Sequence, residues 1–351
     1  MLQENRSSGI ETVVCVTGQH REMLDQVLAA FDITPDYDLD LMRPGQSLTD
    51  LTSRLLHALE PALAAVEPAL VVVQGDTTTS FCAALAAFYA GIPVAHVEAG
   101  LRTFDFKGPF PEEAHRTFTG RLATLHFAPT EWAAGNLRRE GIPPDQIEVT
   151  GNTGIDAVLA IADRLQRGCL PGVKLPLEES KKLLVVTAHR RESFGAGFLQ
   201  ICDAISDLAD RSDVQVVWPV HPNPNVHEAV YAVLGNHPNV LLVEPLAYVP
   251  FVDLMRRAYL IITDSGGIQE EGPSLGKPIL VLREKTERPE AIEAGTAKIV
   301  GYDREDIVRE GALLLESEAE YRRMSFIHNP YGDGKASQRI AERIAAYLKC
   351  Q

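Results

Sequence analysis

The chain has 351 residues, and 33 Lys and Arg against 48 Asp and Glu give a formal net charge of −15. This acid excess argues against broad nucleic-acid binding, although a few local cations can still hold an anion inside a cleft. Apolar residues make up 45% of the chain, which excludes disorder as the main state. No apolar run reaches the roughly 18 residues that span a bilayer, so no membrane partner is expected. The first residues, MLQENRSSG, lack the apolar core of a secretion signal.

The cysteines indicate a reducing compartment. They are five in number, scattered, and never spaced as CxxC. An odd, unclustered set fits reduced thiols in a cytoplasmic protein and offers no zinc site.

In the first half of the chain, short apolar runs alternate with helical stretches, a pattern typical of a parallel sheet covered by helices. Ser47 followed by Asp50 resembles a helix start, and Pro61 is expected to kink or divide that helix. We predict strands at 12–16, 69–73, 92–97, 124–128 and 146–150, and helices near 21–31, 48–66, 78–89, 111–122 and 131–139.

A stretch at 164–180 loses periodicity and gains Pro and Gly, which indicates a linker. A second series follows, with strands predicted at 182–187, 214–220, 240–243, 260–263 and 278–282. We therefore expect an α/β protein of two doubly wound domains, 1–165 and 166–336, with a helix at 337–351 completing the first. No G-x-G-x-x-G follows any strand, so a dinucleotide cofactor has no support.

Ligands of open parallel sheets bind beyond the carboxyl ends of the strands. In this chain, Gly, polar and charged residues follow the predicted strands of both halves. We expect two such edges to face one another across a cleft between the domains.

TDSGGIQEE (263–271) is the most specific of these strand ends. Its glycines let the backbone approach a ligand, and a helix beginning at about Ser265 favours an anion such as a nucleotide phosphate. Glu271, one turn later, could accept hydrogen bonds from ribose hydroxyls. The alternative is a tight turn with Ser265 as a plain N-cap.

AHRRES (188–193) also follows a predicted strand. His189 with Arg190 and Arg191 could stabilise a departing diphosphate. The alternative is a solvated loop, because Arg is usually exposed.

In the first half of the chain, three acidic residues lie at the end of a predicted strand or in the first turn of a predicted helix. Asp76 in QGDTTTS is either functional or an ordinary N-cap. Glu98 in AHVEAGLRT is costly to bury unless paired, so it is either functional or the partner of Arg102. Glu112 in PFPEEAHR is explained without function by an i,i+4 pair with Arg116. Such groups beside a His and several Arg allow acid–base chemistry on a sugar nucleotide.

Together, these segments resemble the bacterial non-hydrolysing UDP-N-acetylglucosamine 2-epimerases over nearly the whole chain. The resemblance is carried by TGQHREMLDQVL, QGDTTT, HVEAGLRT, PEEAHR, GNTGIDA, AHRRESFG, PVHPNPNV, ITDSGGIQEEGPSLGKP, TERPEA and NPYGDG. It implies two Rossmann-like domains in a glycosyltransferase-B-like arrangement, with the active site in the interdomain cleft. It also implies a cytoplasmic homodimer that uses no metal and no nicotinamide or other cofactor.

The reaction implied by the resemblance interconverts UDP-GlcNAc and UDP-ManNAc, an isomerisation that feeds cell-surface polysaccharide biosynthesis. UDP is eliminated anti to leave 2-acetamidoglucal, and re-addition places the proton on the other face. Matching the family's motifs makes Asp76, Glu98, Glu112 and His189 catalytic. Matching its UDP site selects Phe251, Ser265, Gly266, Gly267, Glu271 and Arg288, and an activator site selects Gln19 and His20.

One departure from the family concerns the amino-terminal text. Family members begin with a strand and a loop reading GTRPEAIK, whereas this sequence opens at MLQENRSSGIETVVC. We therefore expect an N-terminally truncated chain with an unfilled position in its first sheet, unstable or nearly inactive as it stands.

Two other functions stay open at this point. A hydrolysing relative would share Asp76, Glu98 and His189 but would release UDP and free ManNAc. A degenerate paralogue would bind the UDP-sugar without converting it.

Overall fold

The computed structural model describes residues 9–19, 21–190, 193–286, 288–326 and 329–350. The chain divides into two compact units, Met1–Asp156 with Gly334–Gln351, and Ala157–Asp333. Within the described residues, no helix is both long enough and apolar enough to cross a bilayer.

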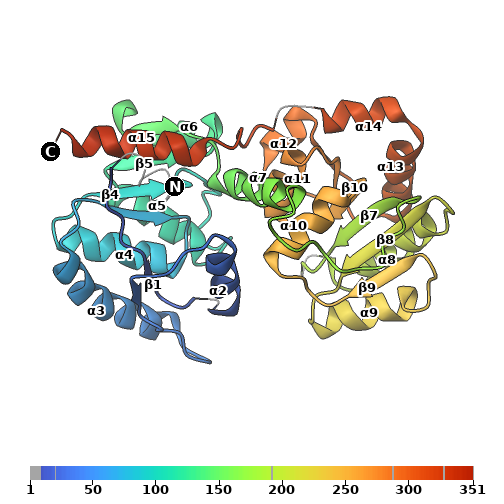
Figure 1. Cartoon of the computed structure of the whole chain (residues 1–351), viewed down its shortest axis with the longest axis horizontal. Helices are drawn as coiled ribbons and strands as arrows, with labels where there is room; N and C mark the ends of the chain where they lie inside the picture. The colour runs from blue at the N-terminus through green and yellow to red at the C-terminus, as the bar shows by residue number, and fades with distance from the viewer. Residues whose placement is uncertain (1–8, 20, 191–192, 287, 327–328, 351) are drawn as a thin grey trace. The chain divides into compact units, whose positions relative to one another are not determined.

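The N-terminal unit is built from short parallel strands and helices (Figure 1). Strands β3 to β6 form one sheet in chain order, whereas β1 pairs only with β2 in a separate two-stranded sheet. The elements are β1 (Cys15–Val16), α2 (Arg21–Ala30), β2 (Tyr37–Asp38), α3 (Leu48–Val66), β3 (Val71–Gln74), α4 (Thr78–Tyr89), β4 (Val94–Val97), α5 (Glu112–Leu122), β5 (Leu125–Ala128), α6 (Glu131–Arg139), the short 3₁₀ turn η1 (Pro144–Gln146), β6 (Ile147–Val149) and α15 (Ala336–Leu348); α7 (Thr153–Gln166) crosses the boundary between units.

The core of this unit lies on both faces of β4 and β5. On one face Val97 and Phe127 pack against Ile340 and Ile344 of α15, the red helix that runs over these strands in Figure 1. On the other face α4 covers β3 and β4 with small apolar side chains. Burial on both faces explains why these strands read as continuous apolar runs.

Two of the sequence predictions concern helix α3. Its N-cap is Ser47, whose side chain accepts from the backbone N–H of Asp50, which confirms the predicted start. Pro61 lies inside α3 but does not divide it, so that part of the prediction is wrong. Proline removes a single helical hydrogen bond, and the face of α3 formed by Leu55 and Leu59 stays buried, so tertiary packing holds the helix together.

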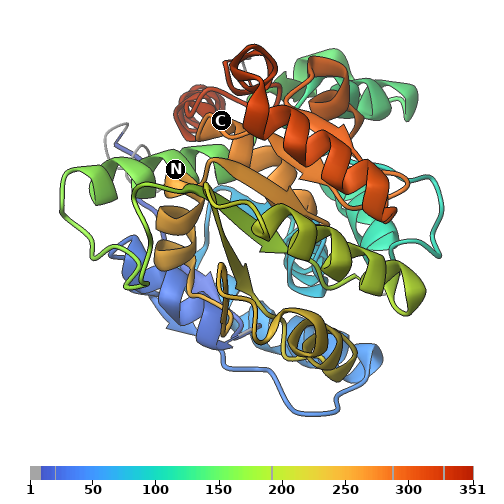
Figure 2. The ribbon, with the colours of Figure 1, turned by 90° about the vertical axis from the view of Figure 1, so that its right-hand side faces the viewer.

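The C-terminal unit holds a six-stranded parallel sheet in the order β12-β11-β10-β7-β8-β9. Figure 2 turns this unit toward the viewer and shows helices on both sides of the sheet. Its elements are β7 (Lys182–Thr187), α8 (Ala196–Ala209), β8 (Val214–Pro219), α9 (Pro224–Leu234), β9 (Val240–Val243), α10 (Tyr248–Arg257), β10 (Leu260–Thr263), α11 (Gly266–Ser274), β11 (Ile279–Val281), α12 (Pro289–Ala294), β12 (Ala297–Ile299), α13 (Arg304–Glu316) and α14 (Glu318–Ser325).

The strand order of this sheet determines where its site lies. β7 and β10 are neighbours at the centre, so the segments that follow them emerge side by side. Crossovers leave β7 toward β8 and β10 toward β11, in opposite directions along the sheet. Such a switch point is where doubly wound sheets bind ligands.

Candidate active site

In the N-terminal unit, two of the predicted carboxylates follow neighbouring strands. The register of β3 and β4 pairs Gln74 with Val97, so the next residues, Gly75 and Glu98, leave the sheet together. A Cβ built on Gly75 would lie 3.7 Å from Oε2 of Glu98. The Glu98 carboxylate therefore lies over the turn that carries Asp76.

The backbone of Glu98 is in a strained conformation. Its φ is +63°, in the left-handed region that a side chain with a Cβ rarely adopts. The predicted alternative, a pair with Arg102, is not what the structure contains, because Arg102 makes a bidentate pair with Glu140 at 2.6 and 3.0 Å. Strain of this kind persists where the fold holds a group for function.

Asp76 is held from two sides by helix α5. Its carboxylate accepts from Nη2 of Arg116 at 2.6 Å, and its carbonyl oxygen lies 3.1 Å from Nδ1 of His115. The N-cap of α4 is Thr77, whose side chain accepts from the N–H of Ser80. The N-cap alternative for Asp76 is therefore wrong, and its carboxylate has no capping role.

Glu112 occupies the first position of α5, but Arg116 pairs elsewhere. Among the described residues, Arg116 contacts Asp76 and, at 3.5 Å, Glu113. The predicted i,i+4 pair between Glu112 and Arg116 is absent from that set. Glu113 is buried and accepts from the backbone N–H groups of Thr103 and Phe104, which ties the loop after β4 to α5.

Two buried histidines lie under these carboxylates. His96 on β4 and His126 on β5 are partners in register. Nε2 of His96 lies 2.8 Å from the carbonyl oxygen of Gly75, which supports the turn that leads to Asp76. Burial lowers the pKa of both imidazoles to about 4, so both stay neutral at physiological pH.

In the C-terminal unit, Asp264 organises the loop after β7. It is buried, and its Oδ2 accepts from the backbone N–H groups of His189 and Arg190 at 2.6 and 2.7 Å. Its Oδ1 lies 3.5 Å from Nδ1 of His189. The His189 ring stacks on His221 with centroids 5.3 Å apart, and burial lowers the pKa of His221. The His189 side chain is 42% exposed and is oriented by these contacts. The solvated-loop alternative for AHRRES stays untested, because Arg191 lies outside the described residues.

The turn after β10 places two glycines at the start of α11. Ser265 occupies the N-cap position, yet its side chain makes no capping bond. A Cβ on Gly266 would lie 2.5 Å from Nη1 of Arg288, so a side chain at this position would displace the guanidinium, whereas Gly267 faces open space. Arg288 donates from Nε to Glu270 at 2.6 Å. A free hydroxyl, first-turn N–H groups and a guanidinium together favour an anion.

Glu271 lies one turn further along α11. Burial, and then the neighbouring charge of Glu270, raise the pKa of Glu271 to about 7. Burial, and then Glu271, raise the pKa of Tyr248 at the start of α10, the helix that also carries Phe251. A half-buried carboxyl beside a phenol can exchange hydrogen bonds with hydroxyl groups of a ligand.

The remaining predicted residues are only partly described. Gln19 accepts a hydrogen bond from the Thr79 hydroxyl at 3.0 Å. His20 and Arg191 lie outside the described residues. In the part of the chain that the structure describes, no group of three or more His, Cys, Asp or Glu could hold a metal ion.

Sequence reasoning missed several positioning groups. Asp264 stands in the TDSGG segment, but a partner 75 residues away carries no sequence signal. The same holds for His96 and for the contact of His115 with Asp76 across 39 residues. Each unit thus holds one set of oriented polar groups. The set in the N-terminal unit is acidic, and the set in the C-terminal unit is suited to binding an anion.

Comparison with known proteins identifies relatives along the full chain. A family model described as UDP-N-acetylglucosamine 2-epimerase matches residues 3–345. The UDP-N-acetylglucosamine 2-epimerase of Salmonella typhimurium is 56% identical over 343 residues, covering 96% of this chain and 91% of that protein. The Escherichia coli K12 protein of the same name is 55% identical over 340 residues, covering 95% and 90%.

Solved structures of proteins with the same name are also similar to this chain. The crystal structure of UDP-GlcNAc 2-epimerase from Neisseria meningitidis bound to UDP-GlcNAc superposes with a TM-score of 0.87 at 46% identity, covering 98% of this chain and 94% of that one. The glycotransferase of kitacinnamycin shares the fold alone, with a TM-score of 0.64 at 13% identity. The expected α/β class of Rossmann-like domains, similar to the glycosyltransferase-B fold, is confirmed.

Proposed function

Because the chain belongs to the UDP-N-acetylglucosamine 2-epimerase family, we propose that it interconverts UDP-GlcNAc and UDP-ManNAc without hydrolysing them. The observation that carries this proposal is the pair of carboxylates, Asp76 and the strained Glu98, which leave neighbouring strands at one edge of the sheet. Acid–base work at a carbon needs two such groups.

The proposed reaction begins with removal of the proton on C2 of the sugar by a carboxylate. The C–H electron pair forms the C1–C2 double bond, and the C1–O bond breaks with its electrons leaving on UDP. The intermediate is 2-acetamidoglucal. In the return step UDP attacks C1 again, and C2 takes a proton on the opposite face. Asp76, Glu98 and Glu112 are the proposed acid–base groups.

The C-terminal unit is proposed to bind the UDP. The diphosphate occupies the start of α11 at Ser265, Gly266 and Gly267, with Arg288 as a cation, and Glu271 accepts from the ribose. Phe251 is the proposed contact of the uracil. His189, fixed by its neighbours, donates to the departing diphosphate.

The decisive experiment runs the reaction in deuterated water and follows the products by NMR. Deuterium at C2 of intact UDP-sugar, in both epimers, is the expected result. Free ManNAc with UDP would instead establish hydrolysis. Retained UDP-sugar affinity without any exchange at C2 would establish an inactive binding protein, and either outcome refutes the proposal.

Roles are tested by Glu98→Gln and Glu112→Gln, each compared with an exposed control, Glu131→Gln on α6. If both groups move protons, turnover falls by about 10²–10⁴-fold in each variant while UDP binding is retained. The control should keep the parental rate. Parental rates in Glu98→Gln or Glu112→Gln would remove that residue from the mechanism.

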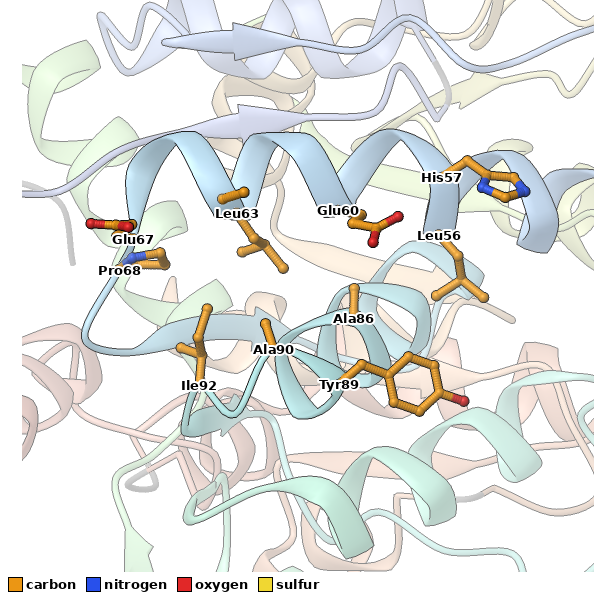
Figure 3. Close-up of a pocket in the computed structure, with 11 residues that line it drawn as sticks. Leu56, His57, Glu60, Leu63, Glu67, Pro68, Ala86, Tyr89, Ala90 and Ile92 are labelled. Carbon is orange, nitrogen blue, oxygen red and sulfur yellow. The ribbon is translucent and has the colours of Figure 1, made fainter.

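We also propose a homodimer in the cytoplasm. A groove of about 710 Å³ lies between α3 and the end of α4, with Leu56 and Leu63 on one side and Tyr89 and Ile92 on the other (Figure 3). Next to it Phe88 is 56% exposed and Tyr89 is 73% exposed, and such apolar exposure favours an interface. Tyr89→Lys should shift sedimentation toward the monomer, and an unchanged dimer would exclude this face.

The proposed activator site at Gln19 and His20 is tested separately. Initial rates in the UDP-ManNAc direction should rise when a small amount of UDP-GlcNAc is added, and Gln19→Ala should reduce that rise. Rates that do not respond to added UDP-GlcNAc would exclude an activator.

A further inference from the structure

The segment NPYGDG (329–334) is a sequence motif to which the proposed function gives no role. Two of its polar side chains are buried, since Asn329 is 6% exposed and Tyr331 is 3% exposed. Buried polar groups need hydrogen-bond partners. The partners of these two residues belong to α11 and to the first turn of α12, the elements that carry the proposed diphosphate site.

The side chain of Asn329 fixes the segment to α11. Its Nδ2 donates to the carbonyl oxygen of Glu270 at 2.7 Å and to Oγ of Ser274 at 2.5 Å. Its Oδ1 accepts from the backbone N–H of Tyr331 at 3.0 Å. One amide therefore uses both of its ends to hold Tyr331 at a fixed place beside α11.

Arg288 is oriented by the same helix. Its Nε donates to Oε1 of Glu270 at 2.6 Å. A Cβ built on Gly266 would lie 2.5 and 3.0 Å from Nη1 and Nη2 of Arg288. The backbone N–H of Arg288 donates to the hydroxyl of Thr286, which itself donates to Gln269 of α11 at 2.8 Å. The terminal nitrogens of this guanidinium therefore lie against the first residue of α11, where their N–H groups suit phosphate oxygens.

A second carboxylate lies near this guanidinium. Glu290 is in the first turn of α12, two residues after Arg288, and its Oε2 accepts from the hydroxyl of Tyr331 at 3.2 Å. Burial, and then the charge of Glu290, raise the pKa of Tyr331, so the hydroxyl keeps the proton that it donates. If this donor is removed, the Glu290 carboxylate can pair with Arg288 instead, because a partly buried anion is costly without a partner.

We propose that Tyr331 is a positioning residue for the diphosphate: its hydroxyl holds the Glu290 carboxylate and so keeps the Arg288 guanidinium directed at the start of α11. Tyr331 acts through these two groups and not on the reacting atoms. The inference rests on the proposed binding of UDP at α11. It predicts that the hydroxyl of Tyr331 contributes to affinity for the phosphates and not to affinity for the nucleoside.

The test compares two ligands of the full chain, UDP and uridine, which has no phosphate. UDP binding is measured by calorimetry and uridine binding by NMR titration. Tyr331→Phe should weaken UDP at least about tenfold and change the Kd of uridine by less than about twofold. The matched control is Tyr259→Phe in the same unit, whose hydroxyl donates to the carbonyl oxygen of Leu314 at 3.4 Å. It should change neither Kd by more than about twofold.

A second substitution separates positioning from a general structural role. Glu290→Gln removes the charge that competes for Arg288, so in the Tyr331→Phe background it should restore UDP affinity to within about threefold of the parent. A merely structural hydrogen bond predicts no recovery, because neither substitution remakes the bond. In an Arg288→Gln background, Tyr331→Phe should have no further effect on UDP, since the two residues act as a unit.

Three results would overturn the inference. They are parental UDP affinity in Tyr331→Phe, equal losses for UDP and uridine, and no recovery on adding Glu290→Gln. If Tyr331→Phe does not fold, Glu290→Gln alone decides: UDP affinity within about threefold of the parent agrees with the inference, and a loss above about tenfold refutes it. A parent chain that does not bind UDP would refute the proposed function itself, whereas a parent that binds UDP with no effect of Tyr331→Phe refutes only the inference.

Discussion

Glu271 offers a quantitative test of the C-terminal site. Burial and Glu270 raise its pKa to about 7, against 4.5 for an unperturbed glutamate. The native state therefore binds the proton more tightly than the unfolded chain does. As pH rises from about 4.5 to about 7, ionisation of buried Glu271 lowers the free energy of unfolding. Above pH 7 this loss of stability is complete. Each tenfold change in proton affinity is worth about 1.4 kcal/mol, so the cost is about 3 kcal/mol.

Glu271→Gln removes the charge and keeps the shape. We expect the variant to be more stable than the parent by up to about 3 kcal/mol at pH 8, with the difference vanishing near pH 4.5. Urea unfolding of the C-terminal unit can be followed by the fluorescence of buried Trp218, with Trp132→Phe as the common background. Glu228→Gln, at an exposed position on α9, is the control and should change stability by less than about 0.5 kcal/mol at either pH.

The same substitution should weaken UDP binding by about tenfold, because the ribose hydroxyls lose a charged acceptor. Stability and binding would then change in opposite directions at one residue. A stability difference that is the same at pH 8 and pH 5 would show that Glu271 is not held at a raised pKa, and the reasoning would be wrong.

Three further predictions concern other residues. Glu140→Ala should destabilise the chain by about 3 kcal/mol in urea unfolding, because it leaves Arg102 buried without its partner; a loss under about 1 kcal/mol would contradict this. Asp76→Asn should lower kcat about 10²–10⁴-fold with UDP affinity unchanged in calorimetry, if it moves a proton; an unchanged kcat would rule that role out. Asp264→Ala should lower kcat about 10- to 100-fold by releasing His189, and Asp264→Asn should recover part of the loss; equal rates in both would argue against positioning.

The buried strands could be predicted closely from the sequence. The predicted strands at 182–187 and 240–243 have the observed bounds of β7 and β9, because Val- and Leu-rich runs bounded by polar residues fit a strand buried on both faces. The short β2 and β12 were not predicted. Their pairing depends on neighbours distant in the chain rather than on their own composition.

The candidate site was predicted less completely. Strand ends identified Asp76, Glu98 and the TDSGG turn, since topology alone brings such ends to one edge. The partners were assigned wrongly wherever they were sought nearby. Arg102 pairs with Glu140 rather than Glu98, and Arg116 with Asp76 rather than Glu112. Local spacing favours i,i+4 pairs, whereas these contacts join residues 38 and 40 positions apart.

The position of α15 has a consequence for biosynthesis. Ile340 and Ile344 complete the core beneath β4 and β5, and Asp156 accepts from the backbone N–H groups of Ala336 and Ser337. All of the C-terminal unit is translated before this helix. The amino-terminal half of a nascent chain must therefore wait on the ribosome with one face of its sheet bare, and a premature stop in the last codons would disable the part of the protein that was made first.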